Sequence, residues 1–440
     1  MEESPLQQHL LEAIPNFMAG VAPGVLLRKS LTAQPLLSSF QPKAILSLGK
    51  AAGAMTQTLA DIFSIAPERT LSILPEGYPK PSVPFPVHEG SHPLPDPRSL
   101  EALGRVQGFI NTLPTDAAVI VALSGGSSSL VAAPLPPVTL SDKIQVTRHL
   151  MEAGAPIDTV NSLRLHLSRF KGGGLAEMLG PRPHTTFVLS DIPGRGSSLV
   201  GSSPMTPVSR NGPRILEEIS LFLSPDKIPP TVRELLLSLS PKEIPPHTFP
   251  EDPLRIVGSS VSLIQAMKEH FLQIPELTSY PLHTLTAELC GEAREAGRVL
   301  ASLIAWGSRS SLEAITGSIW AAAGETTVTL SGTPSGKGGR TLELALSLSM
   351  ALSPIPALVL TLASDGFDGN SGLAGALVPT SFFFSPRRRL EGEAALQLHD
   401  AGGFLERQGL AIRTGPSGTN VNDLVMVIVS PSSTTQRSAS

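Results

Sequence analysis

The first half of the chain repeats one local pattern: a short apolar run, a turn rich in Gly or Ser, and then a helical pattern. The apolar runs are residues 44–48, 117–123 and 186–189. Strands that alternate with helices in this way indicate a parallel sheet with helices packed on it. Ligands of such sheets bind beyond the carboxyl ends of the strands. We therefore expect an α/β fold whose functional residues lie in these three turns.

The second half of the chain shows further strand and helix patterns. We predict strands at residues 254–257, 356–363 and 424–429, a half-exposed strand at 326–330 and a helix at 342–352. A segment rich in Pro, Lys and Glu, from about residue 221 to 253, indicates a domain junction. We expect an N-terminal parallel α/β/α domain over residues 1–245, a C-terminal mixed α/β domain over 246–430, and a disordered polar tail over 431–440.

Composition excludes several classes of protein. The formal net charge of −4 and the isoelectric point near 6.2 lack the basic footprint of a nucleic-acid-binding protein. No apolar stretch reaches the ~20 residues of a membrane helix, and acidic residues stand where a signal peptide is basic. The single cysteine, Cys290, excludes an intrachain disulfide and is expected in a helix core. We expect a cytoplasmic protein without nucleic-acid or membrane partners.

The first two turns carry donors suited to an anion. Gly49 is small enough for a ligand to approach the free N–H groups of the following helix, and Lys50 adds a positive charge. A tight packing turn with a surface lysine explains this motif equally well. The turn at residues 124–129 offers backbone N–H groups and hydroxyls, which favours phosphate binding over a plain helix cap. The G-x-S-x-G pattern of a nucleophilic serine is absent there.

A donor-rich segment follows in the middle of the chain. The spacing of Arg164, Ser168 and Lys171 predicts that the three side chains share one face of a helix. A solvated helix face is the simpler interpretation of this segment taken alone. His92 lies in a stiff proline-containing loop, where a structural role is more common than a catalytic one.

Three aspartates follow predicted strands: Asp191, Asp365 and Asp368. Mg²⁺ prefers one or two carboxylates together with substrate phosphates and water. An Asx turn would explain any one of these aspartates as well. Since all three stand beside glycine-rich turns, we favour a magnesium site, with Asp191 as the first candidate ligand and Asp365 as the second.

Two glycine-containing loops in the second half complete the candidates. Residues 336–340 are not a P-loop, because three residues instead of four separate Gly332 from Gly336, and Gly338 replaces the Ser or Thr. The guanidinium of Arg340 still suits a phosphoryl oxygen. The polar loop at residues 412–424 is a candidate oxyanion site. No G-x-G-x-x-G follows the early strands, so a dinucleotide fingerprint is missing.

The order of these motifs along the chain resembles the bacterial-type glycerate 2-kinases, the family with a C-terminal MOFRL domain. The resemblance spans about residues 8 to 430 and rests on segments 49–55, 92–96, 124–128, 167–173, 190–194, 338–340, 365–369 and 414–423. It implies ATP-dependent phosphorylation of D-glycerate to 2-phosphoglycerate with a divalent metal. It also implies a Rossmann-like first domain and an active site in the cleft between two domains. The essential lysine and arginine of the family correspond to Lys50 and Arg340.

The resemblance and the residue chemistry together give a set of expected sites. Lys50, Arg340 and Asp191 are the expected catalytic residues, and Asp191 and Asp365 the expected ligands of Mg²⁺. The residues assigned to substrate or nucleotide binding are Gly49, Ser124, Gly125, Gly126, Ser127, Ser128, Arg164, Lys171, Gly338, Gly339, Thr414, Gly415, Thr419 and Asn420. The expected partners are D-glycerate and ATP, with a homodimer as the candidate assembly.

Departures from the family pattern keep two alternatives open. Thr341 and Leu342 stand where the family has amides, and Arg195 and Gly196 stand where it has acidic residues. These changes motivate a catalytically weakened homologue that binds a phosphorylated acid. Many members of the family carry the name hydroxypyruvate reductase, so an NAD(P)H-dependent reductase is the second alternative, although the missing dinucleotide fingerprint disfavours it.

Overall fold

The chain forms two compact units in the computed structural model, which describes residues 4–92, 94–191, 200, 202–240, 254–308, 317–330 and 336–431. Unit 1 comprises Met1–Leu26, Asp191–Gly194 and Gly258–Ser440, and unit 2 comprises Leu27–Ser190 and Arg195–Val257. The expected boundary at residues 245 and 246, the departures at Arg195 and Gly196, and residues 432–440 of the expected tail lie outside the described residues.

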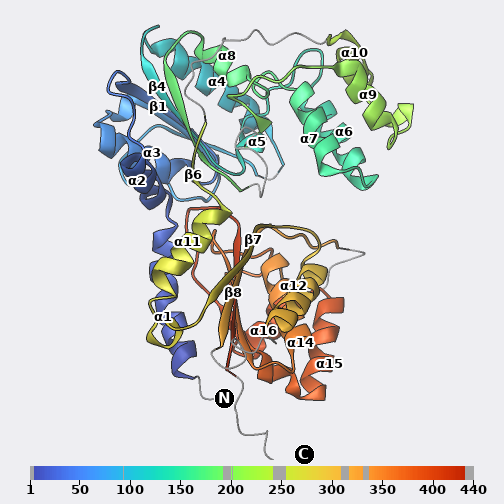
Figure 1. Ribbon diagram of the computed structural model, residues 1–440. Coiled ribbons are helices and arrows are strands. Elements are labelled where there is room, and N and C mark those ends of the chain that lie inside the picture. The colour runs from blue at the N-terminus through green and yellow to red at the C-terminus, as the bar shows by residue number, and fades with distance from the viewer. Residues whose placement is uncertain are drawn as a thin grey trace, which may run out of the picture. The chain divides into compact units, whose positions relative to one another are not determined.

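Unit 2 contains a six-stranded sheet in the order β3-β2-β1-β4-β5-β6 (Figure 1). Its neighbours are parallel in the pairs β2–β3, β1–β2, β1–β4 and β4–β5. This is the strand order of the Rossmann fold, which confirms the predicted parallel α/β architecture. The order reverses between β1 and β4, where chain segments leave the sheet in opposite directions. The strands are β1 (Pro42–Leu48), β2 (Thr70–Pro75), β3 (Val87–Gly90), β4 (Ala118–Leu123), β5 (His184–Leu189) and β6 (Arg255–Gly258).

Two groups of helices accompany this sheet. α3 packs against β1, β2 and β4, whereas α4 packs against β2 and β3. α6, α7, α9 and α10 form a helical group with an apolar core of its own, which includes Val146, Leu163 and Leu236 (Figure 1). The helices are α2 (Pro23–Ala33), α3 (Ala52–Phe63), α4 (Pro97–Thr112), α5 (Ser127–Leu130), α6 (Leu140–Glu152), α7 (Ile157–His166), α8 (Gly174–Leu179), α9 (Gly212–Ser220) and α10 (Pro230–Ser238).

Unit 1 contains a mixed sheet in the order β11-β10-β9-β12-β8-β7. β12 pairs antiparallel with both β8 and β9. Among the described strands of this sheet, only β7 and β8 form a parallel pair. The mixed α/β prediction for this part is confirmed. The strands are β7 (Leu282–Leu289), β8 (Ser318–Gly324), β9 (Ala357–Ala363), β10 (Gly375–Pro379), β11 (Ala411–Ile412) and β12 (Asp423–Val429).

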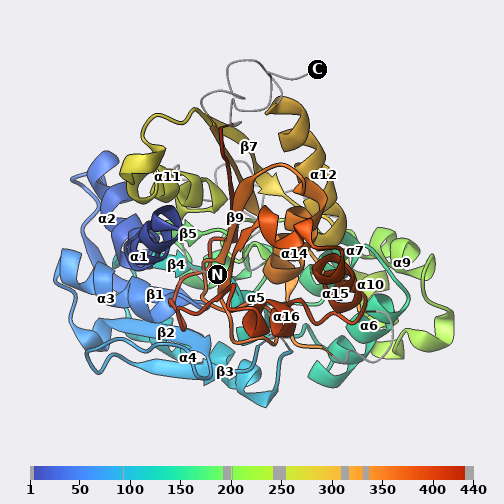
Figure 2. The ribbon, with the colours of Figure 1, turned by 90° about the horizontal axis from the view of Figure 1, so that it is seen from below.

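Helices cover both faces of the unit 1 sheet. Figures 1 and 2 show α1 and α11 on one side of it and α12, α14 and α15 on the other. α14 is buried along nearly its whole length because it packs on α12, β9 and β10. The helices are α1 (Pro5–Gly20), α11 (Ser260–His270), α12 (Ala293–Gly307), α14 (Arg340–Leu352), α15 (Pro386–Gln397) and α16 (Ala401–Arg407). Short 3₁₀ helices span Pro67–Arg69, Pro225–Lys227, Pro275–Leu277 and Thr380–Phe384.

Two local predictions are wrong. Residues 326–330 form no strand: Thr327 makes an isolated bridge to Glu292, and the backbone N–H of Thr329 donates to the Glu292 carboxylate at 2.7 Å. The strand lies earlier, at Ser318–Gly324, where full burial leaves no alternating pattern to read. Cys290 is exposed in the connection between β7 and α12, because the apolar alternation before it belongs to a strand and not to a helix.

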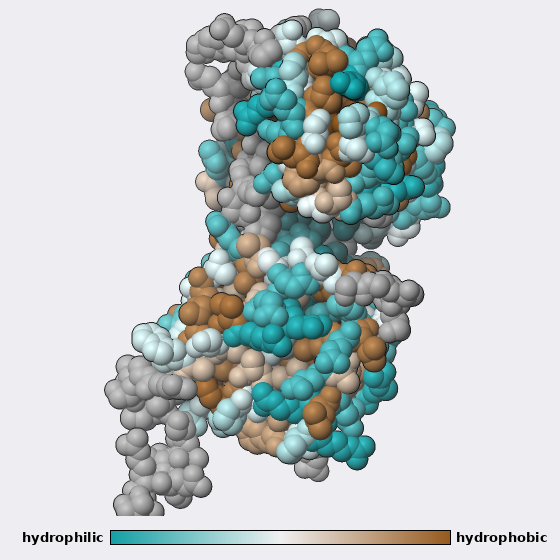
Figure 3. All heavy atoms as spheres, turned by 90° about the vertical axis from the view of Figure 1, so that its right-hand side faces the viewer, coloured by the Kyte–Doolittle hydropathy of each residue, from teal (hydrophilic) through white to brown (hydrophobic). Residues whose placement is uncertain are grey.

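The described surface carries mixed hydropathy. On the face drawn in Figure 3, hydrophobic side chains gather in small groups between hydrophilic ones. Among the described residues, no single helix is long and apolar enough to cross a membrane. α1 and α2, bent by 60° at their junction, meet that criterion only as a pair, on length and composition alone.

Candidate functional site

The polar turns after β1 and β4 meet at the point where the strand order of unit 2 reverses. The backbone N–H of Lys50 donates to the carbonyl of Gly125 at 2.9 Å, and that of Ala51 donates to Ser124 Oγ at 3.0 Å. Gly49 has a φ of 114°, and a Cβ there would lie 2.3 Å from Ser124 Oγ. Only glycine fits this approach without strain. The structure therefore brings two sequence-predicted turns together at the place where such folds bind ligands.

Lys50 and His92 are neighbours at this turn. A Cβ built on Gly126 would lie 3.3 Å from the His92 ring and 3.4 Å from the Lys50 side chain. His92 also shares a hydrogen bond of 2.9 Å between its Nδ1 and Ser129 Oγ. Burial, and then the charge of Lys50, lower the pKa of His92 to about 4, so the imidazole is neutral at pH 7. From sequence we favoured a structural role for His92, because a lone histidine beside prolines carries no specific signal of a binding site.

The loop after β4 also forms one end of a cavity of about 730 Å³ within unit 2. Gly126, Ser128 and Ser129 line it together with His92. Cationic side chains from α6, from α7 and from the turn after α7 line it further along. Ser127 Oγ is buried without a hydrogen-bond partner among the described residues. A buried, unsatisfied hydroxyl costs free energy unless a ligand or water completes it.

The predicted helix face of Arg164, Ser168 and Lys171 is wrong. α7 ends at His166, and the Ser168 hydroxyl instead accepts the backbone N–H groups of Phe170 and Lys171, each at 3.3 Å. A side chain that bonds its own backbone in this way competes with the helix. Arg164 and Lys171 nevertheless line the same cavity, because the chain turns back after α7.

Lys171 is a buried lysine whose side-chain partners among the described residues are neutral. Its side chain is 2% exposed, and its Nζ donates to the hydroxyls of Ser128 and Ser202. Burial, and then the charges of Lys143 and Arg164, hold the pKa of Lys171 well below its usual range. A negatively charged ligand beside this amino group would raise its pKa toward the ordinary value for lysine and favour the charged form.

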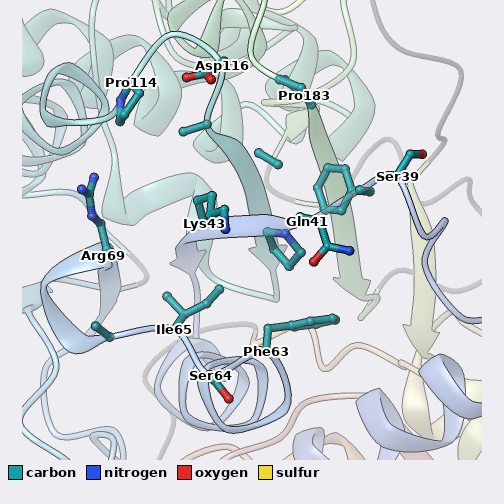
Figure 4. A pocket seen from close by; sticks show the side chains of 15 residues that line it. Ser39, Gln41, Lys43, Phe63, Ser64, Ile65, Arg69, Pro114, Asp116 and Pro183 are labelled. Atoms are coloured by element: carbon teal, nitrogen blue, oxygen red, sulfur yellow. The ribbon is translucent and has the colours of Figure 1, made fainter.

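Unit 2 has a second cavity of about 620 Å³, shown in Figure 4. Lys43 at the start of β1, Arg69 before β2 and Asp116 before β4 line it, so it opens at the amino ends of the strands. These three side chains are exposed, and none of the residues predicted for the site lines this cavity. Its place at the opposite edge of the sheet separates it from the turns that meet at Lys50.

Unit 1 holds Arg340 at the first residue of α14 by two ion pairs. Arg340 Nε lies 2.7 Å from Asp423 Oδ2, and Nη1 lies 2.9 Å from Glu325 Oε1. Burial lowers the pKa of Arg340, but the carboxylates of Asp423 and Glu325 more than offset this, so the net shift is upward. Both carboxylate partners escaped sequence analysis, since they lie on β12 and just after β8, far from Arg340 in sequence.

Asp368 caps the same helix. Its carboxylate, 1% exposed, accepts the backbone N–H groups of Thr341 at 3.1 Å and Leu342 at 2.8 Å. Gly339 packs directly on it, because a Cβ there would lie 2.3 Å from the Asp368 carboxyl carbon. Burial, and then the charge of Asp423, raise the pKa of Asp368 to about 7. Asp368 is thus a buried capping residue, while Asp365 is half-buried and accepts the N–H of Phe367 in an Asx turn.

The polar loop of residues 414–422 contacts both candidate metal ligands. Asn420 Nδ2 lies 3.4 Å from Asp191 Oδ2, and Asn422 Nδ2 donates to the Asp191 carbonyl at 2.6 Å, within unit 1. The N–H of Ser417 donates to the carbonyl of Asp365 at 3.1 Å. Asp191 and Asp365, 174 residues apart in sequence, are therefore anchored by one loop.

The ends of this loop differ in role. Thr414 and Gly415 pack against the turn after β9, where a Cβ on Gly366 would lie 1.9 Å from the Gly415 carbonyl oxygen. Gly338 is likewise engaged in backbone bonding, since its N–H donates to Asn370 Oδ1 at 2.9 Å. Further along, Thr419 Oγ1 and Asn422 Oδ1 are buried and lack partners among the described residues.

The oxygen donors of unit 1 fit a magnesium ion that is held mainly by a ligand. No three acidic, histidine or cysteine side chains come together as a metal cage in the described part of the chain. Asp191, Asp365 and the orphaned Asn422 Oδ1 are hard oxygen donors of the kind that Mg²⁺ takes in small number beside phosphate oxygens.

Comparisons with known proteins match nearly the whole chain. Residues 9–237 match the family described as "Domain of unknown function (DUF4147)", and residues 318–423 match the MOFRL family. A D-glycerate 2-kinase of Thermotoga maritima is 30% identical over 88% of this chain and 90% of its own length. A putative hydroxypyruvate reductase of Agrobacterium vitis is 30% identical over 88% and 86%. The crystal structure of a glycerate kinase from Thermotoga maritima superposes with a TM-score of 0.79 at 27% identity, covering 96% of this chain and 99% of that one.

Proposed function

The chain belongs to the glycerate 2-kinase family, which joins a DUF4147 domain to a MOFRL domain, and we propose that it transfers a phosphoryl group from ATP to the 2-hydroxyl of D-glycerate. One observation carries the proposal beyond family membership. The turn that holds Lys50 meets the loop after β4 at the switch point of a Rossmann-ordered sheet, beside a cavity lined by cations. Oxyanions bind at such places.

We assign Lys50 to the charge of the transferring phosphoryl group. Phosphoryl transfer requires positioning and charge stabilisation more than covalent catalysis. The neutral His92 beside Lys50 supports the assignment, because an uncharged imidazole adds a hydrogen-bonding group without competing for the anion. The donors of Gly49 and of Ser124 to Ser128 would hold phosphate oxygens next to it.

Arg340 is assigned to the second cationic role, toward the phosphoryl group or the carboxylate of glycerate. Its two ion pairs and its place at the start of α14 fix the guanidinium, which supports an oriented, bidentate interaction with an oxyanion. Gly338 and Gly339 leave the backbone before it without side chains. The amides of Asn420 and Asn422 support Asp191 in orienting the 2-hydroxyl.

Mg²⁺ would be held by Asp191, Asp365 and Asn422 Oδ1, and when bound it offsets negative charge on the phosphate oxygens. The protein residues then position the two reactants. Asp191 accepts a hydrogen bond from the 2-hydroxyl of glycerate, and Thr419 and Asn420 supply further polar contacts. Thr414 and Gly415 act indirectly, by bracing the turn at Gly366.

The test is the formation of ADP by the purified chain. With ATP and Mg²⁺, ADP should form only when D-glycerate is added, and chelation of the metal should abolish the reaction. A parallel reaction with NADH, NADPH and hydroxypyruvate should leave the absorbance of the reduced nicotinamide unchanged. Oxidation of the nicotinamide without ADP formation would make the chain a reductase. Nucleotide and glycerate binding without turnover would make it a weakened binding homologue.

We place the enzyme in the cytoplasm, because ATP is available there and the single exposed Cys290 suits a reducing compartment. The homodimer stays a prediction. Sedimentation of the purified chain at several concentrations measures its assembly directly.

A further inference from the structure

Lys143, on α6, is a buried lysine of the unit 2 cavity that has no role in the mechanism above. Its side chain is 5% exposed, and its Nζ has no hydrogen-bond partner among the described residues. It is nonetheless one of the residues that line the cavity. An ammonium group held in this way costs folding free energy, since no carboxylate among the described residues compensates for its burial. A cost of this kind at a cavity wall is typical of a ligand-binding position.

The charges around Lys143 are nearly all positive. Arg148 lies on α6 itself, Arg164 on α7 and Lys171 in the turn after α7, and all three line the cavity. Arg210, just before α9, adds its charge to Lys143, and His92 is neutral. Among the described residues that line the wall, Glu152 is the one carboxylate, and it is exposed at the end of α6. Within the described part of the chain, the cluster of Lys143, Arg164 and Lys171 therefore lacks an internal counter-ion, which favours a ligand with several negative charges.

Apart from Thr147 and the serines of the loop after β4, the rest of the cavity wall is apolar. Leu94, Ala132, Ile144 and Met151 line it, and Met151 is 55% exposed. A three-carbon hydroxy acid has little apolar surface to bury against these side chains, and it fills only a small part of a volume of about 730 Å³. A purine base, in contrast, is flat, apolar on its faces and of the size that such cavities accommodate.

We propose that this cavity binds the adenine nucleotide, with the base against Ile144 and Met151 and the outer phosphates on Lys143, Arg164 and Lys171. The proposal rests on the kinase function above and deepens it by separating the nucleotide from the acid substrate. Ser128 links the two ends of the site, because its hydroxyl bonds Lys171 while its loop reaches Gly126, next to Lys50. The terminal phosphate would point along this loop toward Lys50.

Titration of Lys143 provides a second signature. Burial, and then the charges of Arg164 and Arg210, lower its pKa to about 7. In the protein without ligand, a large fraction of the Lys143 side chains is therefore neutral at pH 7.5. Bound phosphates favour the charged form and raise the pKa again. Nucleotide binding should therefore take up protons near pH 7.5, which calorimetry in buffers of different ionisation enthalpy detects.

The experiment is titration calorimetry of the full chain with ATP, ADP, AMP and D-glycerate. Lys143→Met should lower the affinity for ATP and for ADP on the order of 10- to 100-fold. It should lower the affinity for AMP much less and leave the affinity for D-glycerate unchanged. Lys143→Arg should retain nucleotide affinity but reduce proton uptake. Met151→Gln should lower the affinity for all three nucleotides by one common factor, because it changes the part of the cavity that would contact the base. Lys43→Met, which removes an exposed lysine from the other cavity, is the matched control and should change nothing.

Stability separates a binding role from a structural one. Without ligand, Lys143→Met should unfold at the same temperature as the wild type or higher, because it removes a buried unpaired charge. Unchanged ATP affinity in folded Lys143→Met, or weaker binding of D-glycerate alone, would overturn the proposal while leaving the kinase function intact. Conversely, ATP binding that depends on Lys143 in a chain without turnover would support this site and refute the kinase.

Discussion

Lys50 shows how strongly a single residue here depends on its local backbone. Its main chain is fixed by the hydrogen bond to Gly125, and its position after β1 is set by the left-handed Gly49. The side chain meets His92, whose low pKa keeps the imidazole from competing for anions at neutral pH. The residue therefore combines a fixed backbone with a side chain whose ammonium lies 5.9 Å from the centre of the Tyr78 ring and whose charge acts on His92.

Replacement of Lys50 by Met should lower kcat on the order of 100-fold or more, because the variant loses charge stabilisation in the transition state. The KM for both substrates should change far less, since the cavity and its cations stay in place. Initial rates with saturating ATP and D-glycerate measure this, with Lys43→Met as the control for loss of one lysine. A Lys50→Met rate near that of the wild type would remove Lys50 from the mechanism.

At the scale of one element, α14 connects helix capping to the proposed chemistry. The helix begins at Arg340, and Asp368 accepts the first N–H groups that the helix leaves unpaired. Gly339 lets the backbone approach this carboxylate. The cap therefore fixes the direction of the helix start, and the ion pairs to Asp423 and Glu325 fix the guanidinium.

Asp368→Ala should destabilise the chain by about 2–3 kcal/mol, because two buried N–H groups lose their acceptor. Asp368→Asn keeps an acceptor oxygen, so its loss of stability should be smaller. Because an amide does not ionise, this variant also tests the titration of the carboxyl. The folded-state pKa of Asp368, about 7, lies above its ordinary value. Its contribution to stability is therefore present at low pH and is lost as pH rises through about 7.

Urea unfolding between pH 5 and pH 8 measures this contribution. The wild type should lose stability relative to Asp368→Asn as the pH rises across this range, since the amide does not ionise. Parallel pH profiles for the two proteins would contradict the raised pKa.

The same elements show what sequence can and cannot predict. The turns after β1 and β4 were predictable, because strand, glycine and helix patterns are local. The positions of Arg164 and Lys171 were not predictable, because the helix ends before Ser168, whose hydroxyl accepts backbone N–H groups of the following turn. Lys143 gave no signal, since its burial depends on how α6 packs against the helices that follow it. Asp423 and Glu325 were missed for the same reason: sheet pairing brings them to Arg340.

At the scale of the whole molecule, two sheets of different construction carry the proposed site residues. The parallel sheet of unit 2 presents Lys50 and the cation-lined cavity, and the mixed sheet of unit 1 presents Arg340, Asp191 and the polar loop. Strand order within each sheet could not be derived from the residues alone, because pairing partners are distant in sequence. The resemblance carried by motif order supplied what periodicity could not, and the family match agrees with it.

The most direct test of the account is the identity of the phosphorylated product. ATP, Mg²⁺ and D-glycerate are incubated with the purified chain, and enolase is added, which dehydrates 2-phosphoglycerate but not the 3-isomer. We expect an immediate rise in phosphoenolpyruvate absorbance without a mutase, at a rate equal to that of ADP formation. Glycerate-dependent ADP formation that requires a mutase before enolase can act, or no phosphorylated glycerate at all, would contradict it.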